Sequence, residues 1–250
     1  MDSCLALIDA DFLLYYTTHL KKDDEGNPIE KSFEEITNEA EFYFARILTA
    51  LNTDNYVAAF TSRSFRYDVY PDYKGNRKDG DKPKFFQELK EYCLKKLKFT
   101  YNLGYEADDI VNILKRDPKF YCEDEDQKII VSNDKDLLKL EGTHFDPVKN
   151  RFVETDVEEA ELYFWTSMIT GDSTDNIKGI PGKGVKFAEG LFQVKDQTIV
   201  LPGKVLDSYY DYYGNEGVQE FYKNYKCLKV LDKPMAGFKY PEVQQFKYEE

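Results

Sequence analysis

Carboxylates recur in small groups along this chain, each group beside a short apolar run or at the start of a predicted helix. In parallel α/β sheets the carboxyl ends of the strands meet at one edge, so acids that are far apart in sequence can converge there. Acids gathered in this way repel one another unless cations offset their charge. The pattern therefore predicts a cation-binding centre built from Asp9, Asp11, Glu106, Asp108, Asp109, Asp134, Asp136, Asp172 and Asp175.

The ligand type indicates which cation this centre would hold. Oxygen ligands, without His or Cys beside them, favour Mg²⁺ or Mn²⁺ over Zn²⁺. Two such ions about 4 Å apart can activate a water molecule and stabilise the leaving oxygen of a phosphodiester. Each group of acids also has a structural alternative, because Glu106 to Asp109 would suit a helix N-terminus and Asp134 a helix cap. Their joint placement is what predicts two or more divalent ions.

A glycine-rich segment follows the last pair of acids. Residues 171–184 read GDSTDNIKGIPGKG. Glycine permits positive φ and close backbone approach, and the start of the next helix presents N–H groups that suit a phosphate. A helical hairpin whose glycines only form the turn is the alternative. The nucleic-acid contacts expected here are Gly179, Ile180, Gly182, Lys183, Gly184 and Lys186.

Composition limits the class of protein. The chain has 250 residues, of which 42% are hydrophobic, so it can bury a core, and its net charge of −13 argues against a general coat for nucleic acid. Residues 63–98 nevertheless hold eleven Lys or Arg against six Asp or Glu, a local net charge of +5. No apolar run reaches membrane-spanning length, and the four cysteines lack CxxC spacing. These features predict a cytoplasmic, monomeric protein with reduced cysteines.

The order of the predicted elements positions the acids. Apolar runs predict strands at 4–8, 55–60 and 128–131, and a hairpin at 143–146 and 151–153. Helical periodicity covers 35–51, 84–98, 106–116 and 158–170, and a tail after 234 should pack across the body. This alternation predicts a mostly parallel α/β sheet flanked by helices. We expect a core over 1–170, with a short arch at about 63–98, and a helical region over 171–250 packed on that core.

The motifs DAD, YKGNR, EADD, SNDKD and GDSTDNIKGIPGKG, in this order, resemble the flap endonuclease/5′-3′ exonuclease family. The resemblance covers residues 4–192 and is closest to the phage branch and to the 5′-nuclease domain of bacterial DNA polymerase I. It implies a PIN-like nuclease fold with a helix–three-turn–helix motif at 179–186 that grips duplex DNA and binds K⁺ at the glycine turn. It also implies that the acids other than Asp11 hold the metal ions, that Lys74 and Arg77 contact the scissile phosphate, and that Tyr15 stacks on a terminal base.

Two features depart from the family. The family usually has an Asp just after the second strand, whereas here Phe60 is followed by Thr61, Ser62 and Arg63. One ligand is then missing, or Asp11 takes its place. The arch is also short, because the seven residues between Arg77 and Phe85 span at most about 25 Å.

The resemblance implies a metal-dependent 5′-3′ exonuclease that acts on duplex ends, nicks and 5′ flaps of DNA. RNA in RNA–DNA hybrids is a further implied substrate, and a phage protein would work in the cytoplasm of its bacterial host. Two alternatives stay open. The missing Asp would suit a catalytically weak, structure-specific DNA-binding homologue, and the acids alone would also suit a PIN-like ribonuclease.

Overall fold

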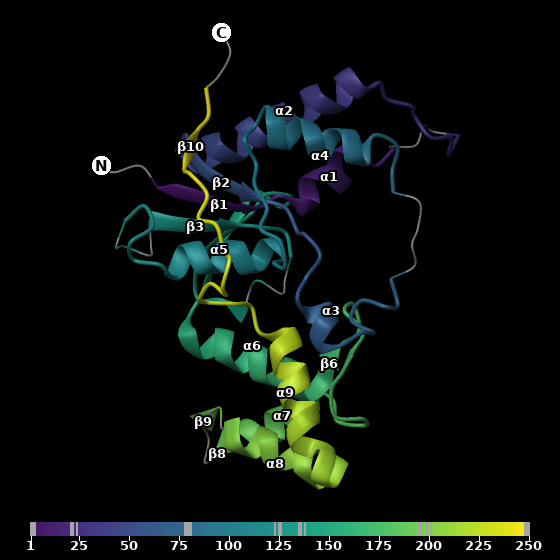
Figure 1. The fold of residues 1–250 in the computed structure, drawn as a ribbon, viewed down its shortest axis with the longest axis vertical. Helices are drawn as coiled ribbons and strands as arrows, with labels where there is room; N and C mark the ends of the chain where they lie inside the picture. Colours follow the sequence, from purple (N-terminus) through teal and green to yellow (C-terminus); the bar gives the residue numbers. More distant parts are fainter. Residues whose placement is uncertain are drawn as a thin grey trace.

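A computed structural model shows an α/β layer above a bundle of helices (Figure 1). The structure describes residues 4–20, 23, 25–77, 82–122, 124, 127–134, 137, 139–194, 197–198, 200 and 202–247. Asp136 and residues 78–81 of the predicted arch lie outside these ranges.

A six-stranded mixed sheet with order β10-β2-β1-β3-β4-β5 forms the centre of the upper layer. The neighbouring pairs β2–β1, β1–β3 and β3–β4 are parallel, while the edge strands β5 and β10 are antiparallel to their neighbours. This confirms the predicted mostly parallel sheet. Its strands are β1 (Leu5–Asp9), β2 (Asn55–Ala59), β3 (Lys128–Val131), β4 (Gly142–Asp146), β5 (Arg151–Thr155) and β10 (Gln244–Gln245).

Alternate residues of the central strands pack on opposite faces of the sheet, and both faces are covered. Ala6 and Ile8 face α1 (Asp11–Thr18), α2 (Phe33–Ala50) and α4 (Phe86–Lys95). Leu5 and Leu7 face α5 (Ala107–Arg116) and the chain after Val230. The predicted tail crosses the body and ends as β10 beside β2 (Figure 1). Burial on both faces explains why β1 is an unbroken apolar run.

A second layer consists of short helices with their own core, which contains Met168, Phe192, Tyr209 and Phe221. Met168 belongs to α6, so this helix packs with the helices that follow it. The helices are α3 (Arg66–Val69), α6 (Val157–Thr170), α7 (Val185–Phe192), α8 (Pro202–Tyr213), η3 (Gly214–Glu216) and α9 (Gly217–Leu228).

A small hairpin lies between α6 and α7, where the sequence predicted only a turn. Its strands are β6 (Gly171–Asp172) and β7 (Ile177–Lys178), and a second short pair, β8 (Gln193–Val194) and β9 (Gln197–Thr198), follows α7. A Cβ on Gly171 or Gly179 would lie 2.2 Å from a backbone oxygen across the hairpin, so both positions require glycine. Among the described residues, no helix has both the length and the apolar content needed to cross a bilayer.

Candidate active site

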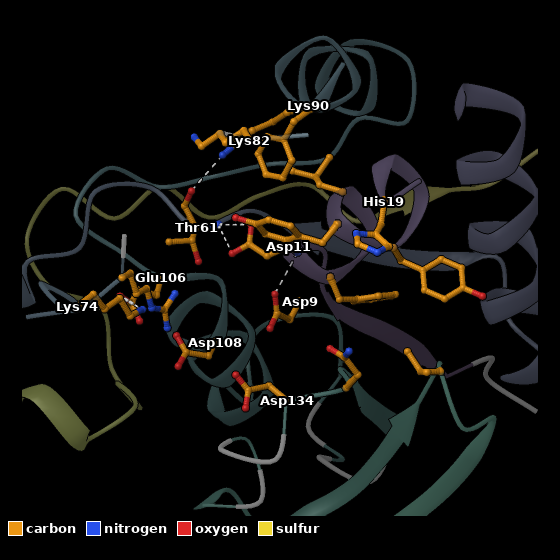
Figure 2. A pocket seen from close by; sticks show the side chains of 18 residues that line it. Asp9, Asp11, His19, Thr61, Lys74, Lys82, Lys90, Glu106, Asp108 and Asp134 are labelled. Atoms are coloured by element: carbon orange, nitrogen blue, oxygen red, sulfur yellow. Dashed lines mark hydrogen bonds and ion pairs between the residues drawn. The ribbon is translucent and has the colours of Figure 1, made fainter. Parts of the chain in front are cut away.

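The ends of β1 and β3 place three acids in one cleft (Figure 2). Asp9 ends β1, Asp11 opens α1, and Asp134 follows β3, which pairs with β1 in parallel. Ser132 links two of them: its hydroxyl donates to Asp9 Oδ2 at 3.3 Å and accepts from the Asp134 N–H at 3.0 Å. The predicted convergence at the sheet edge therefore holds for these acids.

Asp9 is an acid whose ionisation the site disfavours. Withdrawal of its carboxylate from water raises the pKa of Asp9 to about 8, and the neighbouring charges of Asp11 and Asp134 add to this rise. The hydrogen bond from the Asp11 N–H, at 3.2 Å, opposes the rise without cancelling it. A cation placed here would remove the cost of ionising Asp9.

Thr61 stands at the position after β2 where the family usually has an acid, and it connects three elements. Its backbone N–H lies 3.2 and 3.3 Å from the two carboxylate oxygens of Asp11. Its hydroxyl accepts a hydrogen bond from the Ala107 N–H at 3.0 Å, at the start of α5. Its carbonyl accepts from Lys90 Nζ at 3.1 Å. Asp11 thus brings a carboxylate to the end of β2 from the neighbouring strand end.

The sequence EADD forms the start of α5, with Glu106 at its N-cap. Asp108 lines the same cleft as Asp9. Burial raises the pKa of Asp108 well above its ordinary value, and repulsion from Asp109 and Glu106 raises it further. Glu106 and Asp108 are therefore presented to the cleft by one helix N-terminus.

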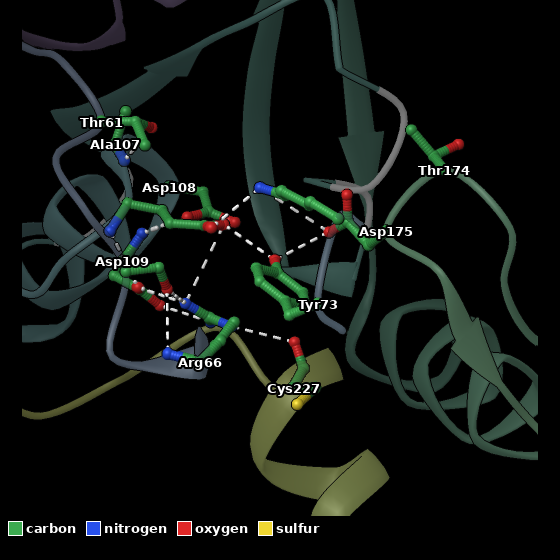
Figure 3. Close-up of polar contacts among 12 residues, drawn as sticks. Thr61, Arg66, Tyr73, Ala107, Asp108, Asp109, Thr174, Asp175 and Cys227 are labelled. Carbon is green, nitrogen blue, oxygen red and sulfur yellow. Dashed lines mark hydrogen bonds and ion pairs between the residues drawn. The ribbon is translucent and has the colours of Figure 1, made fainter. Parts of the chain in front are cut away.

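Asp109 points away from the cleft, into a buried ion pair with Arg66 (Figure 3). Its carboxylate accepts hydrogen bonds from Arg66 Nη1 and Nη2 at 2.7 and 2.8 Å, and both side chains are almost completely buried. Arg66 also donates to the carbonyls of Cys227 and Lys229, and Asp109 accepts from the Leu231 N–H. This geometry speaks against the predicted metal role of Asp109, since both of its oxygens are already used.

The side of the cleft opposite Asp9 is built from paired charges. Lys74 Nζ lies 2.8 Å from Glu106 Oε1 and 3.8 Å from Asp175 Oδ2, and Arg77 Nη2 lies 2.7 Å from Asp175 Oδ1. Burial acts to lower the pKa of Lys74, but Glu106 and Asp175 outweigh it and raise that pKa. Tyr73 joins the two acids, since its hydroxyl lies 3.2 Å from Glu106 Oε2 and 2.8 Å from Asp175 Oδ2.

The β6–β7 hairpin carries the last two acids. Asp172 Oδ1 accepts hydrogen bonds from the N–H groups of Thr174 and Asp175, which fixes the turn. The backbone also ties this turn to the YKGNR segment, because the Lys74 N–H donates to the Asp175 carbonyl at 2.9 Å. Asp172 and Asp175 therefore approach the site from the helical layer and not from the sheet.

Two adjoining cavities hold these groups. One, of about 870 Å³, is lined by Asp9 and Asp11, and the other, of about 290 Å³, by Asp172 and Asp175. Both are also lined by a shared set of residues, namely Lys74, Arg77, Glu106, Asp108 and Asp134. Within the described ranges, no three Asp, Glu, His or Cys side chains already converge on one point as ion ligands. The donor set of carboxylate oxygens nevertheless fits hard divalent cations.

Tyr15 and the glycine turn occupy different places. Tyr15 lines the larger cavity, is 54% exposed, and lies with its ring centroid 4.8 Å from that of Phe86. In the turn, Gly182, Gly184 and Lys186 are exposed, and Lys183 Nζ lies over the ring of Phe187. Gly179 and Ile180 are buried, and the Ile180 side chain belongs to the core of the helical layer, so it is not available for a nucleic-acid contact.

Three residues of the site were missed from the sequence, namely Arg66, Tyr73 and Lys90, and Thr61 was noted only as the place of a missing acid. Tyr73 lies inside the YKGNR motif, and its position there was an available signal. Arg66 was counted only as part of the basic segment, and its partner Asp109 lies 43 residues away. Lys90 looked like one more charge on an amphipathic helix. For Arg66 and Lys90, no local pattern distinguishes a site residue from a surface charge.

Comparisons with known proteins agree with this geometry. Residues 4–163 match the family described as "5′-3′ exonuclease, N-terminal resolvase-like domain". A 5′-3′ exonuclease of Mycoplasmopsis pulmonis is 31% identical over 206 residues, which are 74% of this chain and 64% of that protein. An exodeoxyribonuclease of Enterobacteria phage T3 is 32% identical over 151 residues, 58% of this chain and 48% of that protein. The chain thus spans less than two thirds of the length of each relative.

Among solved structures, the fold is similar to a bacteriophage T5 flap endonuclease in a complex with DNA and metal ions. The TM-score is 0.65 at 19% identity, and the match covers 91% of this chain and 88% of the other. A T5 5′-exonuclease with bound zinc ions gives a TM-score of 0.59 at 20% identity, over 90% and 86% of the two chains. At these identities the likeness supports the fold.

Proposed function

Because the chain belongs to the 5′-3′ exonuclease family, we propose that it is a divalent-metal-dependent nuclease that hydrolyses phosphodiesters of duplex, nicked or 5′-flapped DNA. The observation that carries this proposal is the pair of adjoining cavities that share Glu106, Asp108 and Asp134 and the cations Lys74 and Arg77. Each cavity adds its own acids, so the arrangement suits two Mg²⁺ or Mn²⁺ ions.

The residues can be assigned to tasks on this basis. Asp9, Asp11, Glu106, Asp108 and Asp134 would hold one ion and Asp172 with Asp175 the other, some through water, with Asp136 as a further ligand. Bound ions would supply an activated water and stabilise the leaving oxygen. When ions bind Glu106 and Asp175, Lys74 and Arg77 would be released from these acids. The two cations would then hold the phosphate. Tyr15 would orient the terminal base by stacking.

The duplex away from the cut would rest on the glycine turn. The exposed backbone of Gly182 and Gly184 and the side chains of Lys183 and Lys186 surround the start of α7, where N–H groups can donate hydrogen bonds to a phosphate. A K⁺ ion at the turn would take backbone carbonyl oxygens as its ligands. We propose that the protein acts as a monomer and also cuts RNA in RNA–DNA hybrids.

The test is cleavage of end-labelled substrates in Mg²⁺ and in Mn²⁺. A nicked duplex, a 5′-flap duplex, an RNA–DNA hybrid and single-stranded RNA are compared, each labelled at either end. We expect short products from the 5′ end of the nicked strand and cleavage at the flap base. DNA binding without cleavage in either metal would favour the catalytically weak homologue, and selective cleavage of single-stranded RNA would favour the PIN-like ribonuclease.

A second assay tests the short arch, part of which lies outside the described residues. A protein cap on the 5′ end of the flap blocks threading of the strand. With only seven residues between Arg77 and Phe85, we expect cutting at the flap base to survive the cap. If the cap stops cutting of a flap that is otherwise cut readily, the strand threads and the arch is completed by other residues.

A further inference from the structure

Lys90 is a cation of the cleft that the proposed mechanism does not use. It lies on α4, half-buried, and lines the larger cavity with Asp9, Asp11 and Tyr15. Its Nζ donates to the Thr61 carbonyl at 3.1 Å and lies 5.1 Å from the centroid of the Phe60 ring. Figure 2 shows Lys90 beyond Asp11, on the other side of the cleft from Lys74 and Glu106.

Lys90 differs from Lys74 and Arg77 in how its charge is compensated. Those two cations form ion pairs with Glu106 and Asp175. Within the described part of the chain, Lys90 forms no ion pair within 4.0 Å, and the carboxylate of Asp11 accepts from the N–H of the residue whose carbonyl Lys90 contacts, Thr61. An ammonium has three donors, of which the Thr61 carbonyl takes one. Partial burial lowers the pKa of Lys90, and Asp11 only partly offsets this.

The neighbours of Lys90 on α4 point to the ligand. Phe86 lies one turn earlier on the same helix face and contacts the exposed ring of Tyr15. Lys82 Nζ lies 5.2 Å from the centroid of the Phe86 ring. This face of α4 therefore presents an aromatic contact and, one turn on, a cation directed into the cleft. A nucleotide carries a matching stackable base and an anionic phosphate.

We propose that Lys90 contacts the phosphate on the 5′ side of the nucleotide stacked on Tyr15, as a third substrate cation facing Lys74 and Arg77. This inference rests on the proposed nuclease function. It predicts that Lys90 contributes to binding of the substrate strand more than to the chemical step, because Lys74, which is proposed to stabilise the phosphate that is cut, lies across the cleft.

The experiment measures DNA binding in Ca²⁺, at several salt concentrations, for Lys90→Ala, Lys90→Arg and the control Lys95→Ala. Lys95 lies on the same helix, is exposed, and pairs with Glu91. We expect Lys90→Ala to weaken binding by about tenfold and to shallow the salt dependence by roughly one unit of log slope. Lys90→Arg should restore the slope, and Lys95→Ala should leave it unchanged. In Mg²⁺, Lys90→Ala should raise KM with little change in kcat.

Substrates with a 5′-phosphate or a 5′-hydroxyl identify which phosphate is bound. A loss confined to the 5′-phosphorylated strand assigns Lys90 to the terminal phosphate, and an equal loss on both assigns it to a phosphodiester. The proposal is overturned if the salt dependence of DNA binding has the same slope for Lys90→Ala as for Lys95→Ala. It is also overturned if Lys90→Ala lowers metal affinity while the slope stays unchanged, because Lys90 would then act by supporting Thr61. If the wild-type protein cleaves none of the substrates, the proposed function itself is overturned. The comparison of slopes is measured by binding in Ca²⁺ and does not depend on cleavage.

Discussion

The two sides of the cleft manage negative charge in opposite ways. On the side built by α5, YKGNR and the β6–β7 hairpin, Glu106 and Asp175 already have cationic partners in Lys74 and Arg77. On the side built by β1, Asp9 and Asp11 lie next to each other, and among the described residues neither forms an ion pair with Lys or Arg. Protein charges therefore hold one side together, while the other side keeps unbalanced carboxylates.

This difference indicates on which side of the cleft a bound cation would stabilise the site most. Carboxylates held together without a cation favour protonation, which is the state toward which the raised pKa of Asp9 points. A divalent ion at this side would remove repulsion that the fold otherwise tolerates. On the paired side, an ion would compete with Lys74 and Arg77 for Glu106 and Asp175, and we propose that the released cations bind the phosphate. Each substitution below tests one part of this contrast.

The largest effect is expected at Asp134, beside Asp9. Asp134→Asn removes a proposed ligand, so cleavage in Mg²⁺ should fall roughly 1,000-fold or more, a loss of about 4 kcal/mol in the barrier. DNA binding in Ca²⁺ should stay near that of the wild type because repulsion toward phosphates is reduced. Single-turnover cleavage and anisotropy measure the two quantities. Near wild-type cleavage by this variant would remove Asp134 from the metal site.

Asp109 should behave as a structural residue, unlike the acids of the cleft. Asp109→Asn removes the bidentate partner of buried Arg66 and leaves it only the longer contact to Glu106 at 3.9 Å, so the free energy of unfolding should fall by about 3–5 kcal/mol. Arg63→Met is the matched control: it breaks the exposed pair with Asp68, and we expect a loss of about 1 kcal/mol or less. Urea titration measures both. Unchanged stability together with weakened metal binding would return Asp109 to the metal ligands.

Lys74 tests the paired side. Lys74→Ala removes the cation proposed to stabilise the phosphate in the transition state, so kcat should fall about 100-fold to 1,000-fold. Affinity for duplex DNA should change much less, since we propose that the duplex rests on the glycine turn. Rapid-quench kinetics with excess enzyme separates the two. A loss confined to KM would place Lys74 in substrate binding alone.

Substitutions at Asp11 and Thr61 test whether Asp11 supplies the carboxylate that the family usually has just after the second strand. Asp11→Asn should weaken Mn²⁺ binding by about 10-fold to 100-fold. Thr61→Asp in that background should restore much of the affinity, since residue 61 lies within hydrogen-bond distance of the Asp11 carboxylate. Mn²⁺ titration followed by electron paramagnetic resonance reads the affinity without cleavage. Failure of rescue, in a variant that folds as stably as the single one, would show that the carboxylate has not been relocated.

The smallest effect is expected at the glycine turn, which lines neither of the two cavities described above. Lys183→Ala and Lys186→Ala together should shallow the salt dependence of duplex binding by roughly two units of log slope, because each substitution leaves one phosphate without its lysine. The rate of cleavage at saturating DNA should be nearly unchanged. If the slope stays that of the wild type, duplex DNA is held by another surface.

The sequence alone determined the parts of the fold that depend on local pattern. Apolar runs identified β1, β2 and β3 to within a residue or two, and periodicity identified α2, α4, α5 and α6. These predictions succeed because burial on both faces of a strand, or on one face of a helix, is written into consecutive residues. The order of the motifs also identified the family, and the placement of acids after strands predicted the meeting of Asp9, Asp11 and Asp134.

Only the tertiary structure decided what each charge does. Asp108 and Asp109 are neighbours in sequence, yet one lines the cleft and the other closes on Arg66, because successive residues at a helix start point in different directions. The partners Arg66 and Asp109, Thr61 and Asp11, and Lys90 and Thr61 are 29 to 50 residues apart. Which of these groups meet depends on how layers pack, and the energy of a charge depends on its partner and its burial, neither of which a local pattern contains.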